Sequence, residues 1–241
     1  MILLHGEDGL LFCGPFLERL GPDLTVEAPV HPGWRGAPHP AHVTTIGDLA
    51  YHYLDLLEAR DGPVHLVGLS FGGWLAAEIA VRNPSVVASL VLVSPLGIKV
   101  GPRDHRDHID LYALAPEAAH AAGYSSAAAA PDLAQLDDDG FLTLAVAQEA
   151  VTRFAWQPYL HNPKLVHRLH RIAAPTVVVC GAADALVAVP GYYERFVDAI
   201  GANARLVTVD GVGHRIEEEA PDELAALVTE HVHAATFEGG R

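Results

Sequence analysis

A serine flanked by glycines is the first candidate for chemistry. The run Gly68-Leu69-Ser70-Phe71-Gly72 follows an apolar segment and precedes a helical pattern. Such a strand–turn–helix holds a serine hydroxyl on a tight, strained turn, and glycines two residues before and after it avoid Cβ clashes. The serine then lies at a helix N-terminus, where N–H groups and the dipole favour developing negative charge. The sequence therefore predicts Ser70 as a nucleophile, with an ordinary glycine-rich turn as the alternative.

A serine hydroxyl is a weak nucleophile until a base takes its proton, and one of the 15 histidines is well placed to do so. His214 ends the run Gly211-Val212-Gly213-His214, between the last predicted strand and the last predicted helix. The carboxylate that orients this base is predicted to be Asp184, which follows the preceding strand and emerges at the same edge of the sheet. Asp210 is the rival, since it lies just before His214 and could instead shape that loop.

Acyl transfer also needs backbone N–H groups that stabilise the oxyanion of the tetrahedral intermediate. Phe71, directly after the serine, is one candidate donor. The other is Glu7, in the loop His5-Gly6-Glu7 after the first predicted strand. A carboxylate beside developing negative charge is unfavourable, so the Glu7 side chain either turns away or determines specificity. Both alternatives stay open at this point.

Metal and disulfide chemistry are not expected. His105 and His108 could form a metal pair, but no third ligand follows in a recognisable pattern, so we expect both at the surface and predict no metal and no cofactor. Cys13 and Cys180 lie far apart in sequence without CxxC spacing, as expected for buried apolar residues in a reducing compartment.

Composition restricts the partners. The chain has 241 residues, 50% of them hydrophobic, which suits one domain with a full core. Lys and Arg total 15 against 30 Asp and Glu, and the net charge of -15 argues against nucleic acid and anionic membranes as partners. No apolar run reaches the roughly 18 residues of a membrane span, and the start lacks a basic stretch followed by a long apolar run. We therefore expect a cytoplasmic protein, monomeric or homodimeric.

The elements that must position these residues alternate between short apolar runs and helical periodicity, which is typical of βα units around a buried parallel sheet. The predicted strands are Met1–Leu4, Leu24–Ala28, Val64–Leu69, Leu90–Ser94, Thr176–Cys180 and Arg205–Val209. The predicted helices are Phe12–Leu20, Thr45–Ala59, Phe71–Arg82, Gly191–Ile200 and Pro221–His233. The fold class is therefore α/β.

One long segment, residues 101–163, breaks the alternation. It lacks a convincing strand and carries an apolar helical pattern around Phe141 to Trp156, with Leu142, Val146, Val151 and Phe154 as its apolar positions. An insertion of this length inside a compact domain is usually functional or disordered. We predict a helical lid over the strand ends, inserted into a core domain made of residues 1–100 and 164–241; a solvated helical decoration is the alternative.

The chain resembles the α/β-hydrolase superfamily, specifically its single-domain members with a helical lid between the sixth and seventh strands of the fold. The resemblance rests on the set His5-Gly6, Pro32-Gly33, Gly68-Leu69-Ser70-Phe71-Gly72-Gly73, Gly181 with Asp184, and Gly213-His214. The order Ser70, Asp184, His214 is the chain order of triads in this superfamily. The resemblance implies a three-layer α/β-hydrolase fold and cleavage of an ester, a thioester, a lactone or an activated carbon–carbon bond without a cofactor.

Two departures from the family pattern affect these expectations. The family usually has two further strands before the first strand seen here, so a mostly parallel sheet lacking them is expected, with an edge that is exposed or paired with another chain. In the Pro32-Gly33 loop the family tends to carry an acidic residue two positions before the proline and a Gly-x-Ser ending. This chain has Val30, Trp34, Arg35 and Ala37 there instead, so we expect a different shape at the mouth of the pocket and an unchanged triad.

The predicted function is hydrolysis of a carboxylic ester of small to medium hydrophobic size, through an acyl-enzyme on Ser70. The predicted pocket residues are His5, Trp34, Phe141, Phe154 and Trp156. One alternative is a carbon–carbon bond hydrolase or a biosynthetic tailoring enzyme with the same triad. An alternative of another class is a slow-turnover small-molecule receptor or scaffold of the same fold.

Overall fold

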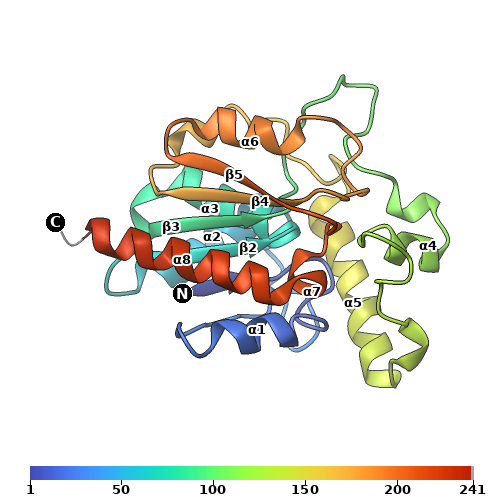
Figure 1. Ribbon diagram of the computed structural model, residues 1–241. Coiled ribbons are helices and arrows are strands. Elements are labelled where there is room, and N and C mark those ends of the chain that lie inside the picture. Colours follow the sequence, from blue (N-terminus) through green and yellow to red (C-terminus); the bar gives the residue numbers. More distant parts are fainter. Residues whose placement is uncertain (240–241) are drawn as a thin grey trace.

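The computed structural model describes residues 1–239 and centres on a parallel sheet of five strands in the order β1-β2-β3-β4-β5 (Figure 1). The strands are β1 Ile2–Leu4, β2 Val64–Leu69, β3 Val87–Val93, β4 Thr176–Gly181 and β5 Ala204–Val209. All neighbouring strands pair in parallel. The carboxyl ends of all five strands therefore meet at one edge of the sheet, as the predicted fold class requires.

Alternation along the central strands explains why both faces of the sheet are covered. In β3, Leu90 and Leu92 belong to one apolar cluster and Val91 and Val93 to another, on the opposite face. Strands that are apolar on both faces must be buried between two layers of helices, since successive side chains point to opposite sides.

Helices supply these two layers (Figure 1). The helices of the core are α1 Gly14–Leu20, α2 Ile46–Glu58, α3 Phe71–Arg82, α6 Tyr192–Ile200, α7 Ile216–Glu219 and α8 Pro221–Gly239, with short 3-10 turns at Pro84–Val86 and Leu169–Arg171. Helices α1, α7 and α8 pack on one face, and α2, α3 and α6 on the other. Helix α2 begins after a capping box in which Thr45 and Asp48 satisfy each other's backbone N–H groups. None of the helices within the described residues has the length and apolar character needed to cross a membrane.

One predicted strand is wrong. Leu24–Ala28 forms a single parallel bridge, between Glu27 and Ile2, and is not a strand of the sheet. Pro29 follows directly and has no N–H for a ladder, so the pairing cannot continue. The segment nevertheless contacts the outer side of β1, where Leu3 N–H donates to the Glu27 carbonyl at 2.8 Å.

The inserted segment 101–163 is helical and lies beyond the carboxyl ends of the strands (Figure 1). Its helices are α4 Pro116–Ala121 and α5 Asp138–Ala155, with 3-10 turns at Leu111–Ala113 and Leu133–Gln135. The side chain of Asp137 caps α5 by accepting from the N–H of Gly140 at 2.8 Å. The buried face of α5 includes Val151 and Phe154, but Leu142, expected on that face, is 51% exposed.

Candidate active site

Ser70 lies on a strained turn between β2 and α3. Its backbone has φ 47° and ψ −107°, and it forms the N-cap of α3. The glycines of the turn are required by close backbone approach. A Cβ on Gly68 would lie 2.3 Å from the Gly72 carbonyl oxygen, and one on Gly72 would lie 2.0 Å from that of Leu4. The sequence pattern thus folds into the sharp strand-to-helix turn that it predicts.

A chain of hydrogen bonds joins the three residues that the sequence singled out. Ser70 Oγ lies 2.6 Å from Nε2 of His214, and Nδ1 of His214 lies 2.8 Å from Oδ2 of Asp184. A carboxylate only accepts, so Nδ1 donates to Asp184 and Nε2 faces the serine. The rival carboxylate, Asp210, is exposed to solvent. The structure therefore brings together Ser70, His214 and Asp184.

Asp184 is held by donors that the sequence did not identify. Its Oδ1 accepts from the N–H groups of Leu186 at 2.9 Å and Val187 at 3.3 Å, and its Oδ2 accepts from the Tyr193 hydroxyl. Burial would raise the pKa of Asp184, but the charge and hydrogen bond of His214, together with these donors, lower it to about 2. Only the fold could reveal Tyr193 as a partner, because it lies on the next helix, α6.

The electrostatics around His214 favour its protonated form. Burial lowers the pKa of its imidazole, but the charge and hydrogen bond of Asp184 and the charge of Glu7 outweigh burial, and the net shift is upward. Arg215 acts in the opposite direction. An imidazole can take a proton and return it within one reaction cycle.

The loop after β1 places a backbone N–H beside the serine. His5 accepts at Nε2 from the His31 N–H at 3.0 Å, so its Nδ1 carries a proton and donates to the Gly6 carbonyl at 2.8 Å. Burial lowers the pKa of His5 to about 4, which keeps this ring neutral. Because a trans peptide holds C=O and N–H on opposite sides, the Glu7 N–H points away from the His5 ring. A Cβ on Gly6 would lie 3.7 Å from Ser70 Cβ, so this peptide adjoins the serine.

The other predicted oxyanion donor is the N–H of Phe71, directly after the serine. Phe71 is the first residue of α3, so its N–H has no partner within the helix. The Glu7 carbonyl is fixed by Trp34, whose Nε1 donates to it at 2.9 Å. Trp34 thus holds the loop that carries the Glu7 N–H.

The Glu7 side chain does not turn away into solvent. Its Oε1 accepts from Ser70 Oγ at 2.6 Å, the same distance that separates Ser70 Oγ from His214 Nε2. Its Oε2 is buried without a hydrogen bond among the described residues, and Nη1 of Arg215 lies 3.6 Å away. Of the two alternatives that the sequence left open, the inward position is the one observed.

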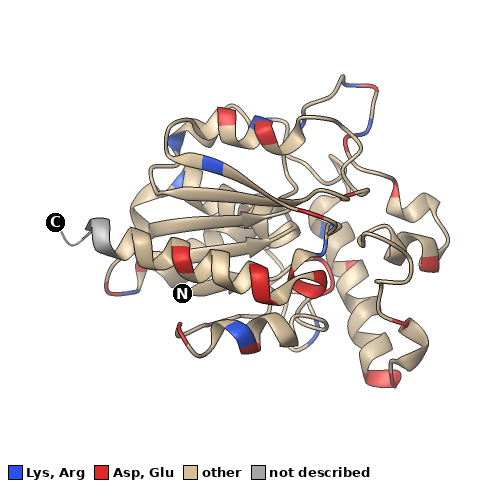
Figure 2. Cartoon of the chain, in the orientation of Figure 1, with Lys and Arg blue, Asp and Glu red and all other residues tan. Residues whose placement is uncertain are grey.

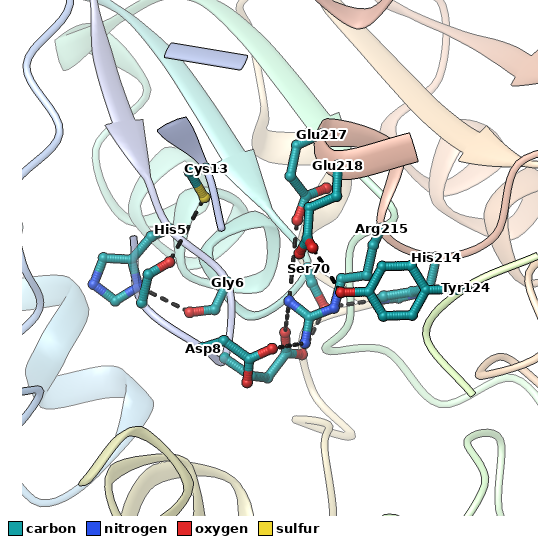
Figure 3. A network of polar contacts seen from close by, with 12 residues as sticks. His5, Gly6, Asp8, Cys13, Ser70, Tyr124, His214, Arg215, Glu217 and Glu218 are labelled. Carbon is teal, nitrogen blue, oxygen red and sulfur yellow. Dashed lines mark hydrogen bonds and ion pairs between the residues drawn. The ribbon is translucent and has the colours of Figure 1, made fainter. Parts of the chain in front are cut away.

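Arg215 is the centre of a carboxylate cluster that sequence analysis missed (Figure 3). Its Nη2 bonds Asp8 at 2.7 Å, and its Nη1 lies 4.0 Å from Glu217. The neighbouring Glu218 accepts from the Tyr124 hydroxyl at 2.6 Å, and burial raises the pKa of Glu218 to about 7. Figure 2 shows acidic residues along α7 and at the start of α8. The surroundings of the site are therefore rich in negative charge.

The predicted pocket residues are only partly brought to the site. Trp34 and Phe154 are buried and stack with ring centroids 5.9 Å apart, which joins the loop between α1 and α2 to α5. Phe141 and Trp156 are about half exposed, and Phe141 faces away from the core. A groove of about 550 Å³ runs along the inserted segment, lined by Tyr112, Glu149, Thr152, Arg153 and Trp156.

One of the two histidines expected at the surface is buried. His105 is exposed and contacts Asp104 at 3.2 Å, but His108 is 2% exposed and lies edge-on to Tyr192. The segment around His108 bridges to Val187, in the loop after Asp184, so the backbone pairing carries this histidine into the interior. Burial lowers its pKa to about 3, so the imidazole is neutral.

Comparison with known proteins places this geometry in a family. The family model for the "Alpha/beta hydrolase family" matches residues 1–227. Lipase LipV of Mycobacterium tuberculosis is 29% identical over 220 residues, covering 86% of this chain and 83% of its own. A poly(3-hydroxyalkanoate) depolymerase of Ectopseudomonas oleovorans is 28% identical over 240 residues, covering 91% of this chain and 81% of its own.

A solved structure extends the likeness to the fold. A meta-cleavage product hydrolase from Pseudomonas fluorescens superposes with a TM-score of 0.77 at 19% identity, covering 97% of this chain and 90% of that chain. The family match spans nearly the whole sequence. The protein belongs to the alpha/beta hydrolase family and is a hydrolase enzyme.

Proposed function

We propose that this hydrolase cleaves carboxylic esters of small to medium hydrophobic size, with Ser70 as the nucleophile, His214 as the base and Asp184 as the residue that orients it. The observation that carries the proposal is the unbroken line of hydrogen bonds from Asp184 through His214 to Ser70, with the serine at the N-terminus of α3. The names of the lipase and depolymerase relatives agree with an ester as the bond that is cleaved.

The reaction proceeds in two halves. His214 Nε2 takes the Ser70 proton while Oγ forms a bond to the acyl carbon, and the backbone N–H groups of Glu7 and Phe71 stabilise the oxyanion. When the intermediate collapses, the bond to the alcohol oxygen breaks, and His214 protonates the departing alcohol. Water then attacks the acyl-enzyme while His214 accepts its proton, and collapse returns that proton to Ser70. The sum is ester plus water giving acid plus alcohol.

The inserted segment 101–163 acts in this proposal as a lid over the acyl site. Its helix α5 reaches the loop that carries Glu7, because Phe154 stacks on Trp34 and Trp34 bonds the Glu7 carbonyl. A lid that contacts the oxyanion loop can couple closure over substrate to the position of the N–H donors.

The carbon–carbon alternative has weaker support. A vinylogous keto acid carries a carboxylate, and the carboxylate of Glu7 lies against Ser70 with Asp8 close behind it. Like charges repel, so a substrate that carries a carboxylate close to Ser70 binds less well than a neutral one. The likeness to the meta-cleavage product hydrolase concerns the fold and does not favour its substrate.

The test of the proposed function is covalent labelling together with turnover. The protein is incubated with a fluorophosphonate and its intact mass is recorded, beside continuous assays with p-nitrophenyl acetate and butyrate. We expect one adduct per chain and sustained turnover, with both lost in Ser70→Ala. Absence of an adduct would contradict the serine mechanism, and an adduct with only a few cycles of ester release would favour the receptor alternative.

A further inference from the structure

The hydroxyl of Ser70 has two acceptors and only one proton. Glu7 Oε1 and His214 Nε2 each lie 2.6 Å from its oxygen. Nδ1 of His214 donates to Asp184, so in the neutral ring Nε2 has no proton of its own. The serine can donate its proton to only one of these two acceptors at a time. While it donates to Glu7, the proton is not directed at His214 Nε2.

Glu7 also lacks the donors that a buried carboxylate requires. Its Oε1 bonds Ser70, and its Oε2 has no hydrogen-bond partner within residues 1–239. Arg215, the cation nearest to it, is 3.6 Å away and already bonds Asp8 at 2.7 Å. The side chain is 12% exposed, so solvent reaches it poorly. A buried acceptor without a donor is unfavourable, and a donor carried by a ligand would remove that cost.

The proposed reaction decides which part of a substrate meets this carboxylate. His214 must protonate the departing alcohol, so the alcohol lies on the His214 side of the acyl carbon. The acyl chain lies on another side of the same carbon, which becomes bonded to Ser70 Oγ. Because Glu7 touches Oγ, substituents on the first two carbons of the acyl chain come within hydrogen-bonding reach of its carboxylate.

We infer that Glu7 is a specificity-determining residue that accepts a hydrogen bond from a donor, a hydroxyl or an ammonium group, on the acyl chain near the scissile carbonyl. This inference rests on the proposed function and deepens it. Such a donor draws Oε1 away from Ser70, and the serine proton then bonds to His214 Nε2. The substrate that satisfies Glu7 thereby prepares the nucleophile, whereas a plain acyl chain leaves the serine bonded to Glu7.

The experiment compares three phenyl esters of equal chain length: butyrate, 3-hydroxybutyrate and 3-aminobutyrate. For wild type we expect kcat/KM with the hydroxyl or the ammonium ester to exceed that with butyrate by about tenfold or more. The preferred ester identifies the donor. In Glu7→Ala, which keeps the backbone N–H of residue 7, we expect the preference among the three esters to disappear.

The control is Asp8→Asn. The Asp8 carboxylate lies on the same loop as Glu7 and bonds Arg215, but it does not bond Ser70. It should retain the wild-type preference, because the acceptor at Glu7 remains. Equal kcat/KM for all three esters in wild type, or a preference that survives Glu7→Ala, would overturn the inference while Ser70-dependent butyrate turnover upholds the proposed function. If Ser70→Ala leaves ester turnover unchanged, the proposed function fails and the inference fails with it.

Discussion

Asp184→Asn should reduce kcat for ester hydrolysis by about 10³- to 10⁴-fold, because it forces the wrong tautomer on His214. In the structure, Oδ1 of Asp184 accepts from the N–H groups of Leu186 and Val187, and Oδ2 faces His214 Nδ1. If the amide oxygen of the variant takes the position of Oδ1, the amide NH₂ group takes the position of Oδ2 and donates to Nδ1 of His214. The ring proton must then lie on Nε2, where it prevents that nitrogen from accepting the Ser70 proton.

The size of the effect follows from the cost of the opposite amide orientation. Turning the oxygen toward His214 would place the NH₂ group against the N–H groups of Leu186 and Val187, and two backbone hydrogen bonds would be lost. Each lost bond costs about 1–3 kcal/mol. A total of about 2–6 kcal/mol leaves between about 1 in 30 and about 1 in 25,000 molecules with the oxygen toward the ring, from the Boltzmann factor for that cost. The variant also lacks the charge that stabilises the imidazolium.

The assay is kcat for p-nitrophenyl butyrate together with the rate of fluorophosphonate labelling, after circular dichroism has shown that the variant is folded. Asp210→Asn is the matched control, because that rival carboxylate is exposed and should leave kcat unchanged. Tyr193→Phe removes one donor to Asp184 without altering the tautomer, so it should cost less than about tenfold. A loss below about tenfold in Asp184→Asn would refute the orienting role.

Three further predictions concern charge and packing. Glu7→Gln should move the acidic limb of the pH profile of kcat/KM to lower pH, because the Glu7 charge helps to raise the pKa of His214 and the base must be neutral; an unmoved limb contradicts this. Gly72→Ala should destabilise the fold by more than about 4 kcal/mol, as measured by urea unfolding, because its Cβ would lie 2.0 Å from the carbonyl oxygen of Leu4 in β1. Gly14→Ala is the control and should not destabilise the fold, because a Cβ there has nothing within 4 Å. Burial lowers the pKa of His5 to about 4, so protons bind preferentially to the unfolded state. The free energy of unfolding should therefore fall by about 2 kcal/mol between about pH 7 and about pH 5. His5→Gln should lose that part of the pH dependence.

The meeting of Ser70, Asp184 and His214 was predictable because it depends on one property of parallel sheets. Ser70 and Asp184 each follow a strand, and His214 follows the last one, so their loops must meet at the carboxyl edge. The false strand at Leu24–Ala28 shows the limit of the same reasoning. An apolar composition identifies a segment that lies against the sheet, but the length of its pairing depends on local features such as Pro29.

The helical insertion was predictable as an element and less so in its orientation. Apolar positions in α5 indicated a buried face, and Val151 and Phe154 lie on it, but Phe141 and Leu142 are about half exposed. Periodicity gives the face of a helix only where the pattern is continuous, and the first turn of α5 is acidic and solvent-facing. His108 was expected at the surface, but it is buried because the backbone around it bridges to Val187, in a loop distant in sequence.

The position of Glu7 could not be read from the sequence because it depends on a residue far along the chain. Arg215 follows His214 directly, so the cation that bonds Asp8 and faces Glu7 is carried by the same loop as the proposed base. The loop with the proposed oxyanion donor and the loop with the proposed base are therefore joined through a buried ion pair next to Ser70. A change at Arg215 alters both loops together, whereas a change of the Glu7 side chain leaves the ion pair between Arg215 and Asp8 in place, and this difference makes Glu7 the sharper position at which to test specificity.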